Sequence, residues 1–116
     1  MKMVIAIIRP ERLEAVEESL RAVLDEQDFY RLTVDNVEGH GRQEGEVELF
    51  RGREVRLRRV PKARLTVCVN ETYVEKTIEA IIKGARTDAV GDGKIFVVPL
   101  EEVVRIRTGE RGSKAI

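Results

Sequence analysis

The alternation of hydrophobic and polar residues predicts two successive strand–helix–strand units. The nearly continuous apolar run 3–8 is typical of a strand buried on both faces. Pro10 stands where a helix can begin, and apolar residues at helical spacing predict a helix at about 10–26. Residues 31–39 then alternate and are rich in β-branched side chains, which favours a strand.

The second half of the chain repeats the pattern. Its expected elements are a strand at 60–69, a helix at 70–86, a strand at 94–100 and a short final strand at 102–108. Thr72 and Glu75 have the spacing of a capping box at the start of the helix. This order predicts an α+β protein of the ferredoxin-like, split βαβ class. Both helices should cover one face of the sheet, so subunit association is expected to cover the other.

Composition indicates a single domain over residues 1–116, with 42% hydrophobic and 36% charged residues. The formal net charge is zero, which argues against a global attraction to nucleic acid or an anionic membrane. Cys68 is the one cysteine, so no intrachain disulfide forms and a cytoplasmic location is expected. It lies in an apolar run and is predicted to be a small buried residue on a strand. No apolar run approaches the ~20 residues of a membrane span.

The motif Gly91-Asp92-Gly93-Lys94 lies between the second helix and the next strand. Asp-Gly is a strong signal for a tight turn, because glycine readily adopts positive φ. Consecutive backbone N–H groups in such a turn also form a concavity that binds anions, and a lysine adds positive charge. These four residues alone leave both interpretations open.

Arg105 and Arg107 are two residues apart in the predicted final strand, so both should point to one face. Their Cα atoms would then lie roughly 7 Å apart, and their charges would repel one another unless an anion lay between them. Together with Lys94 they suit an oligophosphate. A solvated edge strand that carries protective charges is the alternative.

Residues 40–60 fit neither a helix nor a strand pattern well, and loops of this length in small domains are usually functional or disordered. The segment is acidic at first and then strongly basic. It is either a solvated flexible hairpin or a mobile arm that docks a partner. The only histidine, His40, has no Cys/His cluster beside it, and no GxxxxGK[ST] motif or serine–histidine–aspartate set is evident.

Several stretches resemble the PII nitrogen-regulatory signal-transduction proteins of the GlnB/GlnK type, along the whole chain. They are AIIRPERLEAV, GHGRQEG, ARTDAVGDGKIFVVPLEEVVRIRTGE and the terminal KAI. The resemblance implies a ferredoxin-like homotrimer in which ATP and ADP compete for clefts between subunits. It also implies that 2-oxoglutarate binds beside Mg-ATP.

The resemblance implies a role for individual residues as well. The phosphate contacts would be Gly41, Arg42, Gly91, Asp92, Gly93, Lys94, Arg105 and Arg107, and the adenine and ribose side would include Thr33, Arg86 and Thr87. Gln43 would lie near the metal and 2-oxoglutarate, and Lys62 at a 2-oxoglutarate carboxylate. Phe50, Arg51 and Gly52 would contact a partner, and Arg51 matches the arginine with which some members plug an ammonium channel.

One departure from the family pattern lies in FRGREV, where Val55 replaces a tyrosine that many bacterial members have uridylylated. Arg53 stands where some cyanobacterial members have a phosphorylated serine, and residues 40–64 contain no Ser, Thr or Tyr. We therefore expect no hydroxyl-directed modification of this segment. The resemblance implies a regulatory binding protein that controls nitrogen-metabolism targets such as an ammonium transporter. The alternatives are a PII-like sensor of another metabolite or target, a nucleotide-using enzyme, or a nucleic-acid binder through residues 51–64.

Overall fold

The computed structural model describes residues 1–25, 31–42, 49–50, 53–54 and 57–116, and within 41–57 the description is of the backbone only. The strands are β1 (Lys2–Ile8), β2 (Thr33–Arg42), β3 (Leu49–Phe50), β4 (Arg53–Glu54), β5 (Leu57–Val69) and β6 (Gly93–Pro99). The helices are α1 (Leu13–Arg21) and α3 (Val74–Ala85), with the 3-10 turns η1 (Pro10–Arg12), η2 (Glu71–Tyr73) and η3 (Gly112–Ala115).

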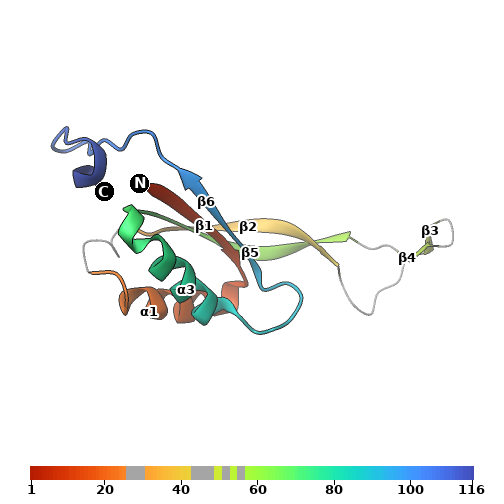
Figure 1. Ribbon diagram of the computed structural model, residues 1–116. Helices are drawn as coiled ribbons and strands as arrows, with labels where there is room; N and C mark the ends of the chain where they lie inside the picture. The colour runs from red at the N-terminus through yellow and green to blue at the C-terminus, as the bar shows by residue number, and fades with distance from the viewer. Residues whose placement is uncertain (26–30, 43–48, 51–52, 55–56) are drawn as a thin grey trace.

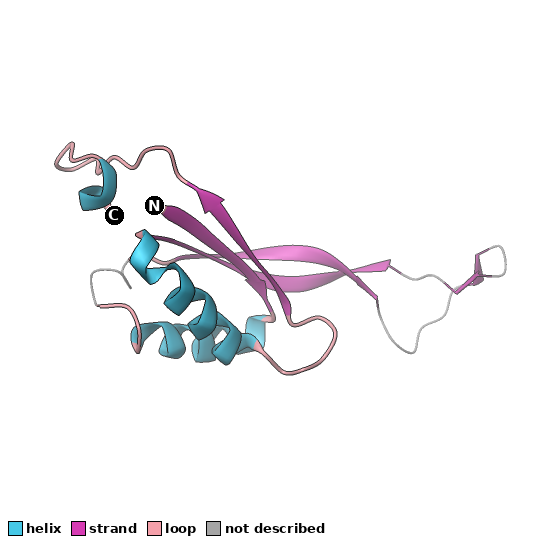
Figure 2. Ribbon diagram, viewed as in Figure 1, coloured by secondary structure: helices cyan, strands magenta, loops and turns pink. Residues whose placement is uncertain are grey.

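Four strands form one antiparallel sheet in the order β2-β5-β1-β6. Helices α1 and α3 cover the same face of this sheet (Figure 1; Figure 2). This arrangement confirms the predicted ferredoxin-like fold. Strands β2 and β5 pair from Thr33–Thr66 to Arg42–Leu57, so both strands continue into the segment that the sequence pattern left unassigned.

The core lies between the sheet and the two helices. Every second residue of β1 from Val4 and of β5 from Ala63 is buried there, and Val16, Leu20 and Ile81 of the helices pack against them. A Cβ on Gly84 would stand 2.6 Å from the Cα of Val16, so α1 and α3 lie in very close contact. None of the described helices combines the length and the apolar character that a membrane span needs.

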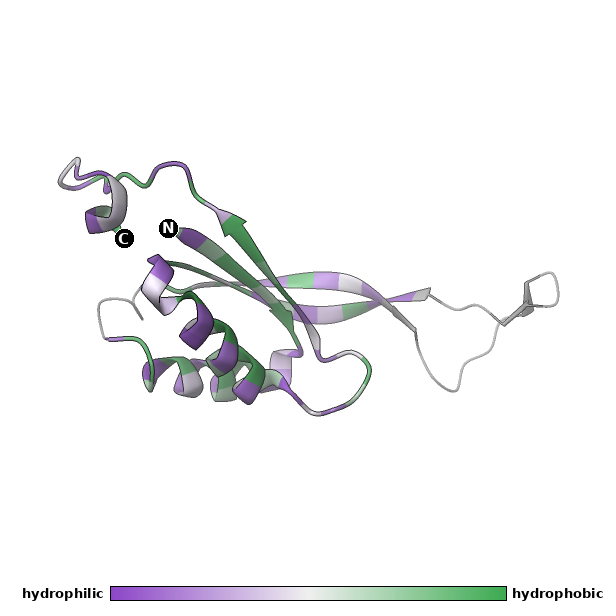
Figure 3. Ribbon diagram, viewed as in Figure 1, coloured by the Kyte–Doolittle hydropathy of each residue, from purple (hydrophilic) through white to green (hydrophobic). Residues whose placement is uncertain are grey.

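The other face of the sheet carries no helix. Met3, Ile5 and Ile7 of β1 are only half-buried there, so the expectation of a strand buried on both faces is wrong for a single protomer. Cys68 belongs to this face too and is half-buried, because β5 turns its alternate residues to the core. Phe96, 49% exposed, continues the face onto the edge strand β6. Figure 3 shows how hydrophobic β1 and β6 are along most of their length.

Three predicted local features are wrong. The first helix begins as a 3-10 turn and its α-helical part ends at Arg21, well before residue 26. The predicted capping box does not form: Asn70 and Tyr73 precede η2 and α3, and neither start has a side-chain cap. Residues 102–108 form no strand, since only Val104 makes an isolated bridge, to Arg111.

A turn replaces the predicted final strand. The amide of Gly109 donates to the Arg105 carbonyl at 2.7 Å, which folds the chain back. The segment then ends in η3, where Ala115 and Ile116 are buried. Asn70 Nδ2 donates to the Ser113 carbonyl at 3.2 Å, which fastens this segment to the start of η2. Both termini therefore lie at the end of the sheet where β6 finishes (Figure 1).

Candidate functional site

The turn that joins α3 to β6, residues 86–93, has an unusual backbone. Asp88, Gly91 and Gly93 have φ angles of 63°, 102° and 105°. A Cβ on Gly93 would stand 1.7 Å from the carbonyl oxygen of Ile7, since Gly93 pairs with Ile8 at the start of β6. Both the conformation and this contact require glycine at position 93. The Gly-Asp-Gly motif therefore forms the tight turn that its sequence indicates.

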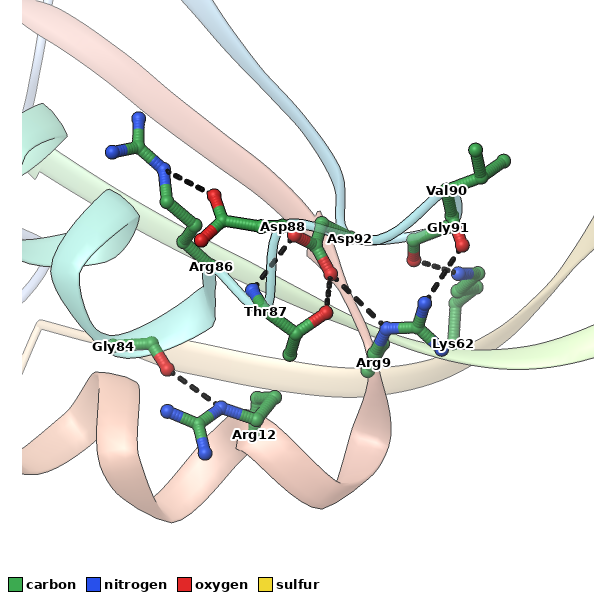
Figure 4. A network of polar contacts seen from close by, with 10 residues as sticks. All are labelled: Arg9, Arg12, Lys62, Gly84, Arg86, Thr87, Asp88, Val90, Gly91 and Asp92. Carbon is green, nitrogen blue, oxygen red and sulfur yellow. Dashed lines mark hydrogen bonds and ion pairs between the residues drawn. The ribbon is translucent and has the colours of Figure 1, made fainter.

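The carboxylate of Asp92 points back into this turn (Figure 4). It accepts hydrogen bonds from the Thr87 amide at 2.8 Å and from the Thr87 hydroxyl. Arg9 Nε donates to the same carboxylate at 3.2 Å. The bonds from Thr87, and then the one from Arg9, hold the pKa of Asp92 well below its usual range. Asp92 is therefore ionised, and its carboxylate closes the turn.

Two cations from other parts of the chain bind consecutive carbonyls of the turn. A terminal guanidinium nitrogen of Arg9 donates to the Val90 carbonyl at 2.7 Å, and Lys62 Nζ donates to the Gly91 carbonyl at 2.6 Å. Lys62 was a predicted site residue, whereas the sequence did not indicate Arg9. The two residues that Arg9 contacts, Val90 and Asp92, are 81 and 83 residues away in the chain. The pairing of Ile8 with Gly93 brings Arg9 next to them.

The register of the sheet places Lys94 next to a groove on the helix-free face. Lys94 pairs with Ile7, which pairs with Arg64, which pairs with Asp35. The groove has a volume of about 690 Å³ and includes Thr33, whose hydroxyl donates to the Thr66 carbonyl at 3.2 Å. The groove thus offers apolar side chains and threonines beside a lysine.

An ion pair crosses this groove between two neighbouring strands. Arg64 Nε donates to Asp35 Oδ1 at 3.0 Å, and a terminal nitrogen of Arg64 donates to Oδ2 at 2.6 Å. The hydrogen bonds and charge of Asp35 raise the pKa of the Arg64 guanidinium above its usual value. Both side chains are about half exposed. The pair is therefore fixed in geometry but contributes little to stability in water.

A second cavity, of about 340 Å³, lies between α3 and β6. Isoleucines line most of it, and Arg86, Asp92 and Lys94 lie among its lining residues. Arg86 forms a 3.9 Å ion pair with Asp88 and is exposed. The predicted residues Arg86, Thr87, Gly91, Asp92 and Gly93 therefore belong to one continuous turn beside Lys62, and Lys94 follows it in β6.

Arg105 and Arg107 do not join the turn of their own protomer. β6 has seven residues, about 20 Å of strand, between the turn and the C-terminal segment (Figure 1). Arg105 forms a 3.4 Å ion pair with Glu110 and donates to the Lys114 carbonyl at 3.2 Å. Arg107 is exposed in a turn. The prediction that both point to one face of a strand is wrong, because that strand is absent.

The remaining predicted residues lie in or beside the segment that follows β2. Gly41 and Arg42 are the last residues of β2 and pair with Arg58 and Leu57, and Phe50 is in β3. Gln43, Arg51 and Gly52 lie outside the described residues, as do Val55 and about half of the expected mobile arm at 40–60. In the part of the chain that the structure describes, no three His, Cys, Asp or Glu side chains gather as a metal site.

Comparison with known proteins identifies the family. The family model described as "Nitrogen regulatory protein P-II" matches residues 1–110. The "Nitrogen regulatory protein P-II 2" of Methanothermobacter thermautotrophicus is 47% identical over all of this chain and 97% of its own. The "Nitrogen regulatory protein GlnK1" of Methanosarcina mazei is 48% identical over the same shares.

A solved structure agrees with these relatives. The chain in "Crystal Structure of Arabidopsis thaliana PII bound to citrate" is 38% identical to this one, with a TM-score of 0.75. The match covers 98% of this chain and 87% of the Arabidopsis chain. The relatives are named as regulators, and this protein is likewise a regulatory protein and not an enzyme, as its sequence indicates. The chain belongs to the P-II family of nitrogen regulatory signal-transduction proteins.

Proposed function

We propose that this protein senses ATP, ADP and 2-oxoglutarate in the cytoplasm and regulates nitrogen-metabolism targets through residues 40–60. The observation that carries the proposal is the glycine turn at 86–93, which Arg9 and Lys62 hold beside Lys94. A rigid turn with basic residues around it suits the phosphates of a nucleotide. Membership of the P-II family supports this assignment over other anions.

The nucleotide would occupy the side of the sheet that carries no helix. Lys94 and the amides of Gly91 and Gly93 would bind phosphate oxygens, as would Gly41 and Arg42 at the end of β2. Thr33 stands in the groove beside Ile5 and Ile7, which suits a purine and its ribose. Arg86 and Thr87 flank the turn. A flat, partly apolar surface that ends in cations matches a nucleotide in both shape and charge.

Two observations support a homotrimer. The turn and the pair Arg105–Arg107 lie at opposite ends of β6, so a site that contains both must combine two protomers. A contact between opposite ends of identical chains is heterologous, and such contacts form a ring, such as a trimer, where the rotation between protomers closes. The helix-free face also leaves Phe96, Val98 and Cys68 partly exposed, which association would bury.

2-Oxoglutarate would bind beside the phosphates, with one carboxylate at Lys62 and the other near Gln43 and Mg²⁺. Lys62 is in β5, the neighbour of β1, and its ammonium already donates to the Gly91 carbonyl of the turn. It is therefore close to the proposed phosphates. Mg²⁺ prefers phosphate, carboxylate and water oxygens over an all-protein site. We therefore expect the nucleotide phosphates and 2-oxoglutarate to supply most of the metal's ligands.

Ligand state would then change the conformation of the 40–60 segment, which starts at the end of β2. Phe50, Arg51 and Gly52 would contact the target, and an ammonium transporter is the target we favour. The Arabidopsis PII was crystallised with citrate bound, so a related protein binds a carboxylate. The citrate ligand favours a second candidate function, that of a PII-like protein that binds a carboxylate other than 2-oxoglutarate or regulates a different target.

Isothermal titration calorimetry tests this function. We expect ATP with Mg²⁺ to bind, and 2-oxoglutarate to bind only in its presence. Lys62→Ala should abolish the 2-oxoglutarate heat and leave ATP binding largely intact, while Lys83→Ala, an exposed lysine of α3, should change neither. A protein that is indifferent to millimolar ATP and ADP would refute the proposal, and 2-oxoglutarate binding that persists in Lys62→Ala would refute the role of Lys62.

A further inference from the structure

We propose that Arg9 is a positioning residue that fixes the backbone of Gly91 for anion binding, by holding the Val90 carbonyl and the Asp92 carboxylate at once. The proposal rests on the phosphate-binding role of the turn given above. It assigns to Arg9 a part in that site which neither the sequence motif nor the family comparison indicates.

The first argument is the geometry of the contacts. One guanidinium reaches the residues on both sides of Gly91: its terminal nitrogen is 2.7 Å from the Val90 carbonyl and its Nε is 3.2 Å from Asp92 (Figure 4). The planar, forked guanidinium suits two acceptors in a fixed arrangement better than an ammonium does. A Cβ on Gly91 would stand 3.1 Å from that terminal nitrogen, so Arg9 packs directly against the Gly91 backbone.

The second argument is the orientation of the peptide planes. The described chain has no cis peptide bond, and in a trans peptide the N–H points opposite to the carbonyl. Since the Val90 carbonyl faces Arg9, the Gly91 N–H must point away from it. Lys62 fixes the next plane through the Gly91 carbonyl. The two cations together therefore set two consecutive peptide planes in a turn with φ of 102° at Gly91.

The third argument is that Arg9 is itself held in place. Pro10 restricts the residue before it to extended conformations, and Arg9 has φ −63° and ψ 133°. Its side chain is 27% exposed and that of Asp92 is 23% exposed, so water screens their ion pair only in part. With Nε and a terminal nitrogen already bonded to the turn, Arg9 acts on an anion through Gly91 rather than as its main ligand.

The experiment compares Arg9→Met with Arg12→Met in the full-length protein. Arg12 is a matched control, because its Nε also donates to a backbone carbonyl, that of Gly84 at 2.9 Å, but outside the turn. Both variants lose one positive charge. We expect Arg9→Met to weaken binding of inorganic tripolyphosphate and of ATP by about 10- to 100-fold, the range for a lost charge-assisted hydrogen bond, and Arg12→Met to change it less than about twofold.

Amide hydrogen exchange gives a readout that does not depend on binding. The Asp92 amide donates to the Ala89 carbonyl at 3.3 Å, so its exchange should accelerate in Arg9→Met relative to the core amides of β1, and not in Arg12→Met. Unchanged exchange in this turn would overturn the positioning role. If the wild-type protein binds neither tripolyphosphate nor ATP, the proposed function fails, while the exchange result still decides whether Arg9 orders the turn.

A double-mutant cycle with Asp92→Asn separates positioning from direct ligation. If Arg9 acts through the turn, the two substitutions disrupt the same structure, and the double variant should bind tripolyphosphate about as weakly as Arg9→Met alone. Affinity losses that multiply in the double variant would show that Arg9 contacts the anion independently and would contradict the proposal.

Discussion

Gly93 lies so close to Ile7 that a Cβ on the glycine would stand 1.7 Å from the Ile7 carbonyl oxygen. We predict that Gly93→Ala loses at least about 3 kcal/mol of stability, because strain at positive φ adds to a clash with backbone that cannot move aside. Gly91→Ala should cost less, about 1–2 kcal/mol, since its neighbour is the end of a flexible arginine side chain. Urea unfolding followed by circular dichroism measures both, and equal losses would contradict this contact.

The crossing of the two helices gives a second prediction. A Cβ on Gly84 would stand 2.6 to 2.8 Å from backbone atoms of Val16 and Ala15, so Gly84→Ala should force α1 and α3 apart. The expected cost is about 1–3 kcal/mol, although alanine has the higher helix propensity. The control is Lys83→Ala on the exposed side of the same helix, which should be nearly neutral. A Gly84→Ala variant with raised thermal stability would show that the helices are not in such close contact.

Asp92 predicts a pH dependence. Its folded pKa is below its usual value of about 3.9, so ionised Asp92 stabilises the fold above that pH, and this contribution is lost as the pH falls through the folded value. Thr87→Val removes the hydroxyl that contributes most to the shift, and should raise the pKa of Asp92. The stability difference between wild type and Thr87→Val should be constant above about pH 5 and shrink below pH 4.

NMR titration of the Asp92 carboxyl carbon measures this pKa directly, and Arg9→Met should raise it by less than Thr87→Val does. An unchanged Asp92 pKa in Thr87→Val would contradict the hydrogen bond from the Thr87 hydroxyl.

The helix-free face predicts an effect on assembly. Phe96→Asp places a charge on this face at the edge strand β6, where Phe96 is 49% exposed in a single protomer. The variant should shift the protein from the proposed trimer to a monomer, because burial of an unpaired carboxylate at an interface is costly. Lys76→Asp, on the exposed side of α3, is the control and should leave assembly intact. Light scattering after size exclusion measures the mass, and an unaltered assembly in Phe96→Asp would place the interface elsewhere.

The fold was predictable because its signals are periodic. Alternating or continuous apolar runs gave four strands in the right order, and the stripe of residues such as Ile81 gave α3. The segment at 102–108 misled the prediction, because Val104 and Ile106 alternate with arginines as they would in a strand. Ile106 is in fact 99% exposed in a turn. The alternation of apolar and polar residues in this segment therefore does not correspond to a buried face in a single protomer.

The candidate site was only partly predictable. The local sequence of the glycines and Asp92 predicts a turn. The contacts of Arg9 with that turn are more than 80 residues away in the chain, and no local pattern indicates them. A capping box at Thr72 and Glu75 was expected from spacing alone, yet the 3-10 turn η2 displaces the helix start to Val74. Local patterns thus identified residue types that form turns, while sheet register decided which side chains meet there.

The central claim is that the turn of one protomer and Arg105–Arg107 of another share one phosphate site. The most direct measurement mixes two double variants that should each fail to bind ATP. One carries Gly91→Ala and Lys94→Met in the turn, and the other carries Arg105→Met and Arg107→Met. After unfolding and joint refolding at equal amounts, about a quarter of the clefts in a random ring combine an intact turn with intact arginines from its neighbour. The account predicts that ATP binding returns to about a quarter of the wild-type stoichiometry, and a mixture that binds no ATP would contradict it.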